Sequence, residues 1–296
     1  MTSTADQSRR DFLAAGAGLV ASAACLRGAP TRKNKMTFGF TTYLWGRDWD
    51  IPTLIKNCTE LKAYGVELRM EYKSAHGVEL EIEPTRRAEV KKRFADSPIK
   101  LLGLATSERL DWIDPEKLKQ AIEKAKRYVQ LSHDVGGHGI RVFPNDFHKE
   151  VPQEQTITQV ARSLNELGEF AAGYGQLIRI ENHGTAGRLA TLKQVFDSVT
   201  EKNVGVKLNC DAKDAADGAF EANFNLVKNH LEDTLHFHDL KAPGFPYQLQ
   251  TSLLMDCGWP GCWLAEMDGK PADPMAELKE QRRLWDGLIA ASLARA

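Results

Sequence analysis

The sequence predicts a closed barrel of eight parallel strands surrounded by helices, the (β/α)8 or TIM-barrel architecture. Eight short apolar segments recur from Met36 onward, and longer segments with helical periodicity separate them. A chain of 296 residues is also long enough for one barrel of about 250 residues. Strictly alternating strands and helices are typical of a parallel sheet, and eight such units close it into a barrel.

The predicted strands are short runs rich in Val, Ile, Leu and Phe. In chain order they centre on Phe38–Phe40, Val66–Leu68, Leu101–Leu104, Ile140–Val142, Leu177–Ile180, Val204–Leu208, Leu235–Phe237 and Trp263–Ala265. No Pro/Ser-rich or low-complexity stretch follows residue 35. We therefore expect one barrel domain over residues 31–296, preceded by a separate segment over residues 1–30.

The segments between the strands carry apolar residues at helical spacing. From Pro115 to Leu131, the residues Leu118, Ile122, Ala125 and Val129 recur every three or four positions, and residues 156–172 show the same pattern. Proline is favoured in the first turn of a helix, and Asp114 before it is a suitable N-cap. These signals predict helices that cover the outside of the barrel.

The N-terminal segment resembles a twin-arginine export signal. The paired arginines Arg9 and Arg10 precede Phe12 and a run of small apolar residues, and Ala21-Ser22-Ala23 provides a cleavage site. The apolar run is shorter than the roughly 20 residues that span a bilayer, which disfavours a membrane anchor. We expect an exported, periplasmic protein that uses the twin-arginine export machinery, with lipidation of Cys25 as a minor alternative.

The charge of the chain disfavours nucleic acid as a partner. Lys and Arg number 39 and Asp and Glu number 40, giving a formal net charge of -1. Binding to phosphate backbones relies on an excess of positive charge, which this chain lacks. A small molecule is the expected partner, and the sequence leaves the oligomeric state open.

Several predicted strands alternate charged and apolar side chains. Ile178 and Ile180 alternate with Arg179 and Glu181. The same pattern places Glu67 and Arg69, then Lys207, Asn209 and Asp211, and then His236 and His238 on one face of their strands. Because the apolar face packs under the helices, the polar face would point into the barrel lumen. Burial of unpaired charge is costly, so a polar lumen predicts a compensating ion or ligand.

Four of these polar residues follow one another at the spacing of one β/α unit. Glu181, Asp211, His238 and Glu266 are separated by 30, 27 and 28 positions. One unit takes about 30 residues, so the four would share one level at the carboxyl ends of successive strands, where barrel enzymes place their active sites. Three carboxylates and an imidazole repel one another unless a cation neutralises them. We expect one divalent metal ion, with Mn²⁺ favoured and Mg²⁺, Co²⁺ or Zn²⁺ as alternatives.

The same residues resemble those of the sugar phosphate isomerase/epimerase family with the xylose-isomerase-like TIM barrel, over residues 36–290. The resemblance rests on Gly65-Val66-Glu67-Leu68-Arg69, Glu181-Asn182-His183, Asp211, His236-Phe237-His238 and Glu266. It implies that Glu181, Asp211, His238 and Glu266 bind the metal. His236 lies two positions before His238 and so faces the same side of the strand, which makes either imidazole a candidate ligand.

Candidate substrate-binding residues are His183, Arg141, His236 and Lys241. A guanidinium such as that of Arg141 can bind a carboxylate or phosphate through two parallel hydrogen bonds. His183 has the alternative role of stabilising a loop at the rim. Lys241 is the nearest cation after His238, where the ketose 3-epimerase pattern has an arginine.

The resemblance implies a divalent-metal-dependent isomerase or epimerase that acts on a sugar or keto-sugar through a metal-stabilised enediolate, with Glu181 and Glu266 relaying the proton. The chain departs from the ketose 3-epimerase pattern at Asp214, where that pattern has histidine. A lyase or dehydratase of a keto-sugar, keto-inositol or oxidised glycoside is therefore an alternative. A non-catalytic exported sugar-binding barrel is a second one, and a nuclease would need a basic groove that the sequence does not show.

Overall fold

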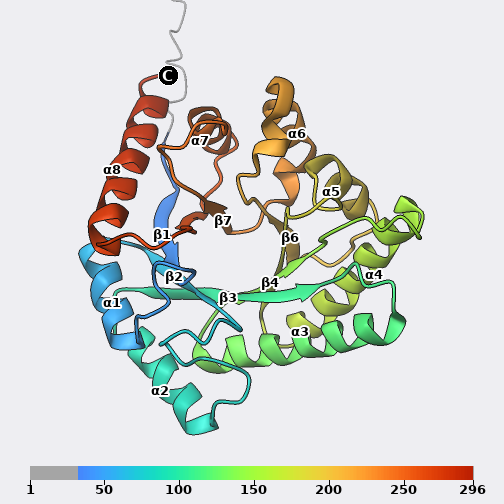
Figure 1. The fold of residues 1–296 in the computed structure, drawn as a ribbon, viewed down its shortest axis with the longest axis horizontal. Coiled ribbons are helices and arrows are strands. Elements are labelled where there is room, and N and C mark those ends of the chain that lie inside the picture. The colour runs from blue at the N-terminus through green and yellow to red at the C-terminus, as the bar shows by residue number, and fades with distance from the viewer. Residues whose placement is uncertain (1–32, 296) are drawn as a thin grey trace, which may run out of the picture. The chain divides into compact units, whose positions relative to one another are not determined.

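Eight parallel strands lie at the centre of the computed structural model, which describes residues 33–295, and helices surround them (Figure 1). The predicted export signal and Cys25 lie outside the described residues. Within the described part, no helix is both long and apolar enough to cross a bilayer.

The strands are β1 Thr37–Thr41, β2 Gly65–Arg69, β3 Lys100–Arg109, β4 Gly139–Phe143, β5 Leu177–Glu181, β6 Val204–Lys207, β7 Thr234–Phe237 and β8 Cys262–Ala265. They pair in the order β6-β5-β4-β3-β2-β1-β8-β7. Each predicted strand centre falls on one of them, and the predicted (β/α)8 TIM barrel is confirmed.

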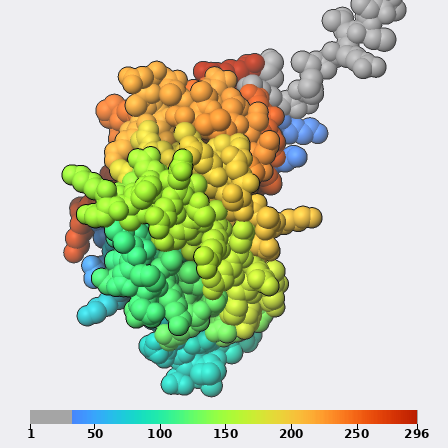
Figure 2. All heavy atoms as spheres, turned by 90° about the vertical axis from the view of Figure 1, so that its right-hand side faces the viewer, coloured from blue at the N-terminus to red at the C-terminus, as the bar shows by residue number. Residues whose placement is uncertain are grey.

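The helices are α1 Ile51–Glu60, α2 Pro84–Ala95, α3 Pro115–Val135, α4 Gln153–Ala172, α5 Leu189–Phe196, α6 Phe220–Val227, α7 Tyr247–Asp256 and α8 Pro274–Leu293, with short 3-10 helices η1 Ala212–Gly218 and η2 Lys228–His230. In the space-filling view of Figure 2, successive units stack in chain order, from cyan at one end to orange at the other. Helices that follow one another along the chain are also in contact, as are α2 with α3, α3 with α4, α4 with α5 and α7 with α8.

The barrel closes between β6 and β7 through isolated hydrogen bonds rather than a continuous ladder. Val206 forms a single bridge with Leu231, and the His236 amide donates to the Leu208 carbonyl at 2.7 Å. The other neighbouring strands pair as parallel ladders, and the register shifts between Val66 and Glu67 in the β2–β3 ladder and between Ala105 and Arg109 in the β3–β4 ladder. This seam lies beside two of the predicted site residues, His236 and Asp211.

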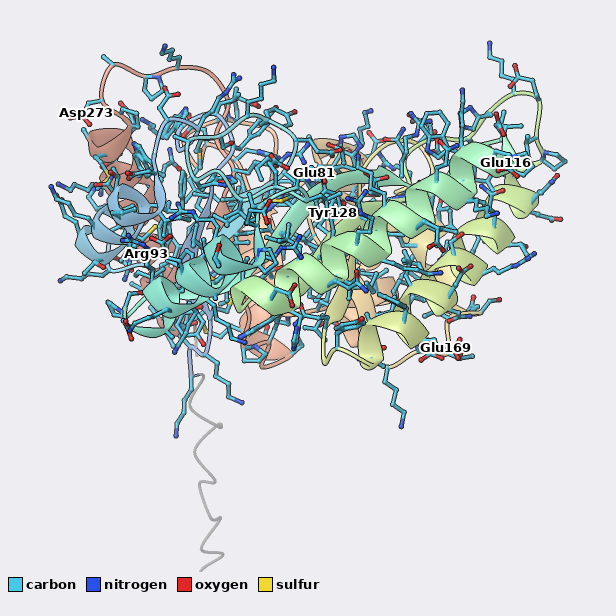
Figure 3. The ribbon with its side chains drawn as sticks, turned by 90° about the horizontal axis from the view of Figure 1, so that it is seen from below. Glu81, Arg93, Glu116, Tyr128, Glu169 and Asp273 are labelled. Carbon is cyan, nitrogen blue, oxygen red and sulfur yellow. The ribbon has the colours of Figure 1, made fainter. Side chains whose placement is uncertain are left out.

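Helix α3 shows how local sequence signals set the outer layer. Asp114 caps its first turn by accepting from the amides of Glu116 and Lys117, as predicted, and Gly136 ends it with a φ of 85°. Figure 3 shows α3 beside α4, with Glu116 near the start of α3 and Glu169 toward the end of α4. The apolar faces of both helices are buried against the strands.

The strands separate an apolar outer layer from a polar lumen. Ile178 and Ile180 belong to the apolar core and are fully buried. Arg179 and Glu181, which alternate with them, are equally buried but form ion pairs. The predicted alternation of apolar and charged faces is therefore present, and the charged face contains the candidate site.

Candidate active site

The floor of the site is a buried ion pair between β2 and β6. The Lys207 ammonium lies 2.6 and 2.7 Å from the two carboxylate oxygens of Glu67, and both side chains are fully buried. Burial alone would raise the pKa of Glu67, but the charges of Lys207 and His236 hold it well below its usual range. Glu67 is therefore ionised at neutral pH.

His236 on β7 lies at the centre of the lumen and contacts three carboxylates. Its Nε2 is 2.6 Å from Glu67 Oε2, and its Nδ1 is 3.0 Å from Glu181 Oε2 and 3.2 Å from Glu266 Oε2. Burial would lower the pKa of this ring, but Glu266 and the other carboxylates raise it to about 10. In the protein without a metal ion, His236 is therefore a cation.

Glu181, at the end of β5, is paired with Arg141 on β4. The guanidinium Nη1 lies 2.8 Å from Glu181 Oε2, and both side chains are almost completely buried. Burial would raise the pKa of Glu181, but Arg141 and His236 lower it overall, and His236 lowers that of Glu266 in the same way. Both carboxylates are therefore ionised at neutral pH.

A cavity of about 660 Å³ opens above this cluster, at the carboxyl ends of the strands. Its walls combine aromatic, charged and amide side chains, including Tyr43, Arg69, Tyr72, Arg141, Phe143, Glu181, His183, Asn209, Asp211, His238, Phe245, Tyr247, Glu266 and Asp268. Small-molecule sites of roughly 300–1,000 Å³ are lined by aromatic walls with a few converging polar groups. The cavity has the size and composition of such a site.

The structure brings Glu181 and Glu266 together but places Asp211 differently. Strand β6 ends at Lys207, and Cys210 has a left-handed φ of 49°, which interrupts the alternation of side chains before Asp211. The Asp211 carboxylate lines the cavity and caps η1 by accepting from the Lys213 amide at 2.8 Å. The role of Asp211 as a metal ligand stays a prediction.

His238, directly after β7, also lines the cavity. Its Nδ1 lies 3.0 Å from the Glu266 carbonyl and its Nε2 lies 3.1 Å from the Asn209 carbonyl. The two ring nitrogens therefore contact backbone oxygens rather than the carboxylate cluster, which consists of Glu67, Glu181 and Glu266 around His236. The preference for His238 over His236 as a ligand stays a prediction, and His236 is the imidazole that contacts Glu181 and Glu266.

The predicted substrate-binding residues differ in where they lie. Arg141 and His183 line the cavity, and the His183 ring packs on Phe143 with 4.7 Å between ring centroids. His236 lies beneath, in the carboxylate cluster. Lys241 is half exposed and pairs with Glu277 at 3.0 Å, and it is not among the residues that line the cavity. Their roles in substrate binding stay predictions.

The donor set fits a divalent ion. Within residues 33–295, Glu181, His236 and Glu266 each offer one ligand atom, and these atoms lie within 4.8 Å of one another. Ligands about 2.1 Å from one ion lie at most about 4.2 Å apart, so small side-chain movements suffice. Glu67 accepts from the other nitrogen of His236, which is the usual carboxylate–histidine–metal arrangement. In addition, the buried amide oxygen of Asn209 has no hydrogen-bond partner among these residues.

Sequence reasoning did not assign roles to Glu67, Lys207 and Asn209. Glu67 and Lys207 share the lumen-facing parity of the predicted site residues, but parity does not reveal that they pair across the barrel. Asn209 has the same parity as Lys207 and a side chain suited to a hard cation. Spacing does not separate Asn209 from Asp211, because they lie 28 and 30 positions after Glu181 and both distances match one β/α unit.

Comparison with known proteins places the fold. A 3-keto-D-glucoside 4-epimerase from E. coli superposes with a TM-score of 0.67 at 15% identity, covering 87% of this chain and 100% of that chain. An L-ribulose 3-epimerase gives 0.70 at 14% identity, covering 88% and 96%, and the IolI protein with a bound zinc atom gives 0.72 at 14%, covering 86% and 99%. At these identities the likeness shows the fold alone.

No sequence among curated proteins matches this chain. One family model does, described as the xylose isomerase-like TIM barrel, and it matches residues 55–286. This range begins in α1, ends in α8 and includes every residue of the carboxylate cluster. The chain therefore belongs to the xylose isomerase-like TIM barrel family.

Proposed function

We propose that this protein is a divalent-metal-dependent isomerase or epimerase of a sugar or keto-sugar. The observation that carries the proposal is the convergence of Glu181, His236 and Glu266 beneath a cavity at the carboxyl ends of the strands. Membership of the family supports the same reaction class. The solved epimerases of similar fold are consistent with it, although the likeness extends only to the fold.

Glu181 and Glu266 are the proposed proton-transfer groups. Both are ionised at neutral pH, because nearby positive charge outweighs the effect of burial on their pKa values. Either can take a proton from a carbon next to a carbonyl group. Return of a proton to the opposite face of that carbon gives an epimer, whereas return to the neighbouring carbon gives an isomer.

The ion would be held by Glu181, Glu266 and His236, and it would supply positive charge to the oxygen atoms of the substrate. Arg141 orients Glu181 through their hydrogen bond, and Glu67 orients the His236 ring. The aromatic rings of Tyr43, Tyr72 and Phe143 on the cavity wall offer surfaces for the apolar face of a sugar ring.

The test is hydrogen exchange in D2O. The purified protein is incubated with aldoses, ketoses, a 3-keto-glucoside and a keto-inositol, with chelator and then with Mn²⁺, Mg²⁺, Co²⁺ or Zn²⁺ restored. We expect metal-dependent uptake of deuterium next to the carbonyl of one substrate class, together with an epimer or isomer, detected by NMR and chromatography.

Other products would point to the other candidate functions. Release of an aglycone or water with one of these substrates would identify a lyase or dehydratase instead. Binding of a sugar without deuterium uptake under every metal condition would identify a sugar-binding barrel and reject the proposed catalysis.

We also propose that the protein is exported by the twin-arginine route and acts in the periplasm. The support is the sequence of residues 1–30, with Arg9 and Arg10 before a short apolar run. This route carries folded proteins, which suits a barrel that acquires its metal ion before export.

A further inference from the structure

The side-chain oxygen of Asn209 is a buried acceptor with no hydrogen-bond partner among residues 33–295. Its Oδ1 makes no hydrogen bond within the described chain, although the residue lines the same cavity as Glu181 and Glu266. An unsatisfied buried acceptor costs about 1–3 kcal/mol, and such groups in native proteins generally have a partner. The position of Asn209 at the cavity indicates that the partner is a bound species.

Hydrogen bonds hold the backbone N–H and C=O groups of Asn209 in place. The Asn209 N–H donates to Asn182 Oδ1 at 2.5 Å, and the Asn209 carbonyl contacts His238 Nε2 at 3.1 Å. Asn182 in turn donates to Asp214 Oδ2 at 2.9 Å, and Asp214 is 2% exposed. The chain Asp214–Asn182–Asn209 therefore fixes the residue while leaving its side-chain oxygen unused, as expected of a preorganised ligand.

Asp211, the carboxylate predicted for this position on β6, has another function in the structure. The left-handed conformation of Cys210 separates it from the alternation that places Lys207 and Asn209 on one face. Its Oδ1 accepts from the Lys213 amide and caps η1. It is also absent from the group of converging ligand atoms found in residues 33–295.

We propose that Asn209, and not Asp211, supplies the oxygen donor from the segment after β6 to the divalent ion held by Glu181, His236 and Glu266. The inference rests on the metal site of the proposed function and changes its composition. An amide oxygen is an accepted ligand of hard cations, but it contributes no charge. The donor set then carries two carboxylates instead of three, and affinity for hard divalent ions falls as ligand charge decreases.

The experiment measures metal binding without sugar. The full-length protein is stripped with chelator, and Mn²⁺ binding is followed by electron paramagnetic resonance and calorimetry for the wild type, Asn209→Asp, Asn209→Ala and Asp211→Asn. We expect Asn209→Asp to tighten binding about tenfold or more and Asn209→Ala to weaken it to a similar extent, because one ligand gains charge or is lost. Asp211→Asn should change the affinity less than about threefold, since a cap does not touch the ion.

Several outcomes would overturn the assignment. These are unchanged affinity in Asn209→Asp, a large loss of affinity in Asp211→Asn, or no Mn²⁺ binding by the wild type. If Asn209→Ala fails to fold by circular dichroism, the isosteric Asn209→Asp variant decides. Absence of sugar turnover with intact, Asn209-dependent Mn²⁺ binding would reject the proposed function and leave the ligand assignment standing.

Discussion

Glu181 is the residue whose removal most directly tests the proposed chemistry. Glu181→Gln keeps the size of the side chain but removes the base, so turnover of the identified substrate should fall by at least about a hundredfold. Circular dichroism and a thermal melt should show that the fold is retained. Glu60→Gln, at an exposed position at the end of α1 and paired with Lys279, is the matched control for loss of one carboxylate. Undiminished turnover in Glu181→Gln would reject its catalytic role.

Lys207 tests how much the lumen depends on paired charge. Lys207→Met leaves Glu67 without its main counter-ion in a fully buried position, so the free energy of unfolding should fall by about 3–5 kcal/mol. Lys279→Met, which breaks an exposed pair with Glu60, should cost no more than about 1 kcal/mol. Urea denaturation of both variants measures the difference. Equal losses of unfolding free energy in the two variants would show that the buried pair contributes no more to stability than the exposed one.

Glu232, just before β7, gives the stability of the protein a predictable pH dependence. Burial raises its pKa to about 7, with Asp233 raising it further and Arg179 opposing the shift. A carboxyl that holds its proton more tightly when folded contributes stability below its unfolded pKa of about 4.3 and loses it as pH rises through 7.

Glu232→Gln should therefore stabilise the protein at pH 8 relative to pH 4. At about 1.4 kcal/mol per pKa unit, reduced for partial solvent exposure, the gain should be on the order of 2 kcal/mol. Urea denaturation across this pH range measures it, with exposed Glu169→Gln as the control. A wild-type and a Glu232→Gln curve that run parallel from pH 4 to pH 8 would contradict the assignment.

At the scale of elements, Gly103 determines how closely β3 approaches β4. Its φ is 153°, and a Cβ at this position would lie 2.4 Å from the Gly139 carbonyl oxygen and 2.8 Å from Arg179 Nη1. Gly103→Ala should therefore destabilise the barrel by about 2–4 kcal/mol, through backbone strain and overpacking.

The matched control is Gly287→Ala in α8, where a Cβ meets no atom within 4 Å. Because alanine favours helix, this change should leave stability unchanged or raise it by up to about 1 kcal/mol. Denaturant midpoints report both variants. If the two substitutions had the same effect, the close approach of β3 and β4 would not require glycine.

The backbone after β6 departs from the regular alternation that its sequence predicts. A strand continued with period two would carry Lys207, Asn209 and Asp211 on one face, and the predicted ligand followed from that continuation. The strand instead ends at Lys207, and the backbone turns at Cys210. The segment 207–211 contains no glycine, the residue that most often marks a left-handed conformation, so the local sequence does not predict the turn.

At the scale of the whole barrel, charges from six strands balance one another. Glu67, Glu181 and Glu266 pair with Lys207, Arg141 and His236, and the contacts of Glu67 with Lys207 and His236 join strands that are not neighbours in the sheet. Opposite charges in these pairs offset one another, which reduces the cost of burying them. A divalent ion that binds there would replace part of the positive charge that His236 and Arg141 provide.

The N-terminal segment predicts where the protein is located in the cell. Replacement of Arg9 and Arg10 by lysine should keep a fusion of this protein in the cytoplasm, whereas the unaltered chain should appear in the periplasm with a cleaved N-terminus. Cell fractionation and intact mass measure both results, and replacement of Arg32 and Lys33 by glutamine is the control. Export of the double lysine variant at the normal level would argue against this route.

The sequence by itself determined the barrel, the order and place of its strands, and the polar face that lines its lumen. These follow from local periodicity and from the repeat length of one β/α unit, as at Ile178–Glu181. Only the tertiary structure decided which polar residues meet. Glu67 and Lys207 lie 140 positions apart and Glu67 and His236 lie 169 apart, so their contacts depend on how strands across the barrel are staggered. The break in alternation between Asn209 and Asp211 likewise depends on a single backbone turn at Cys210, for which no periodic pattern exists.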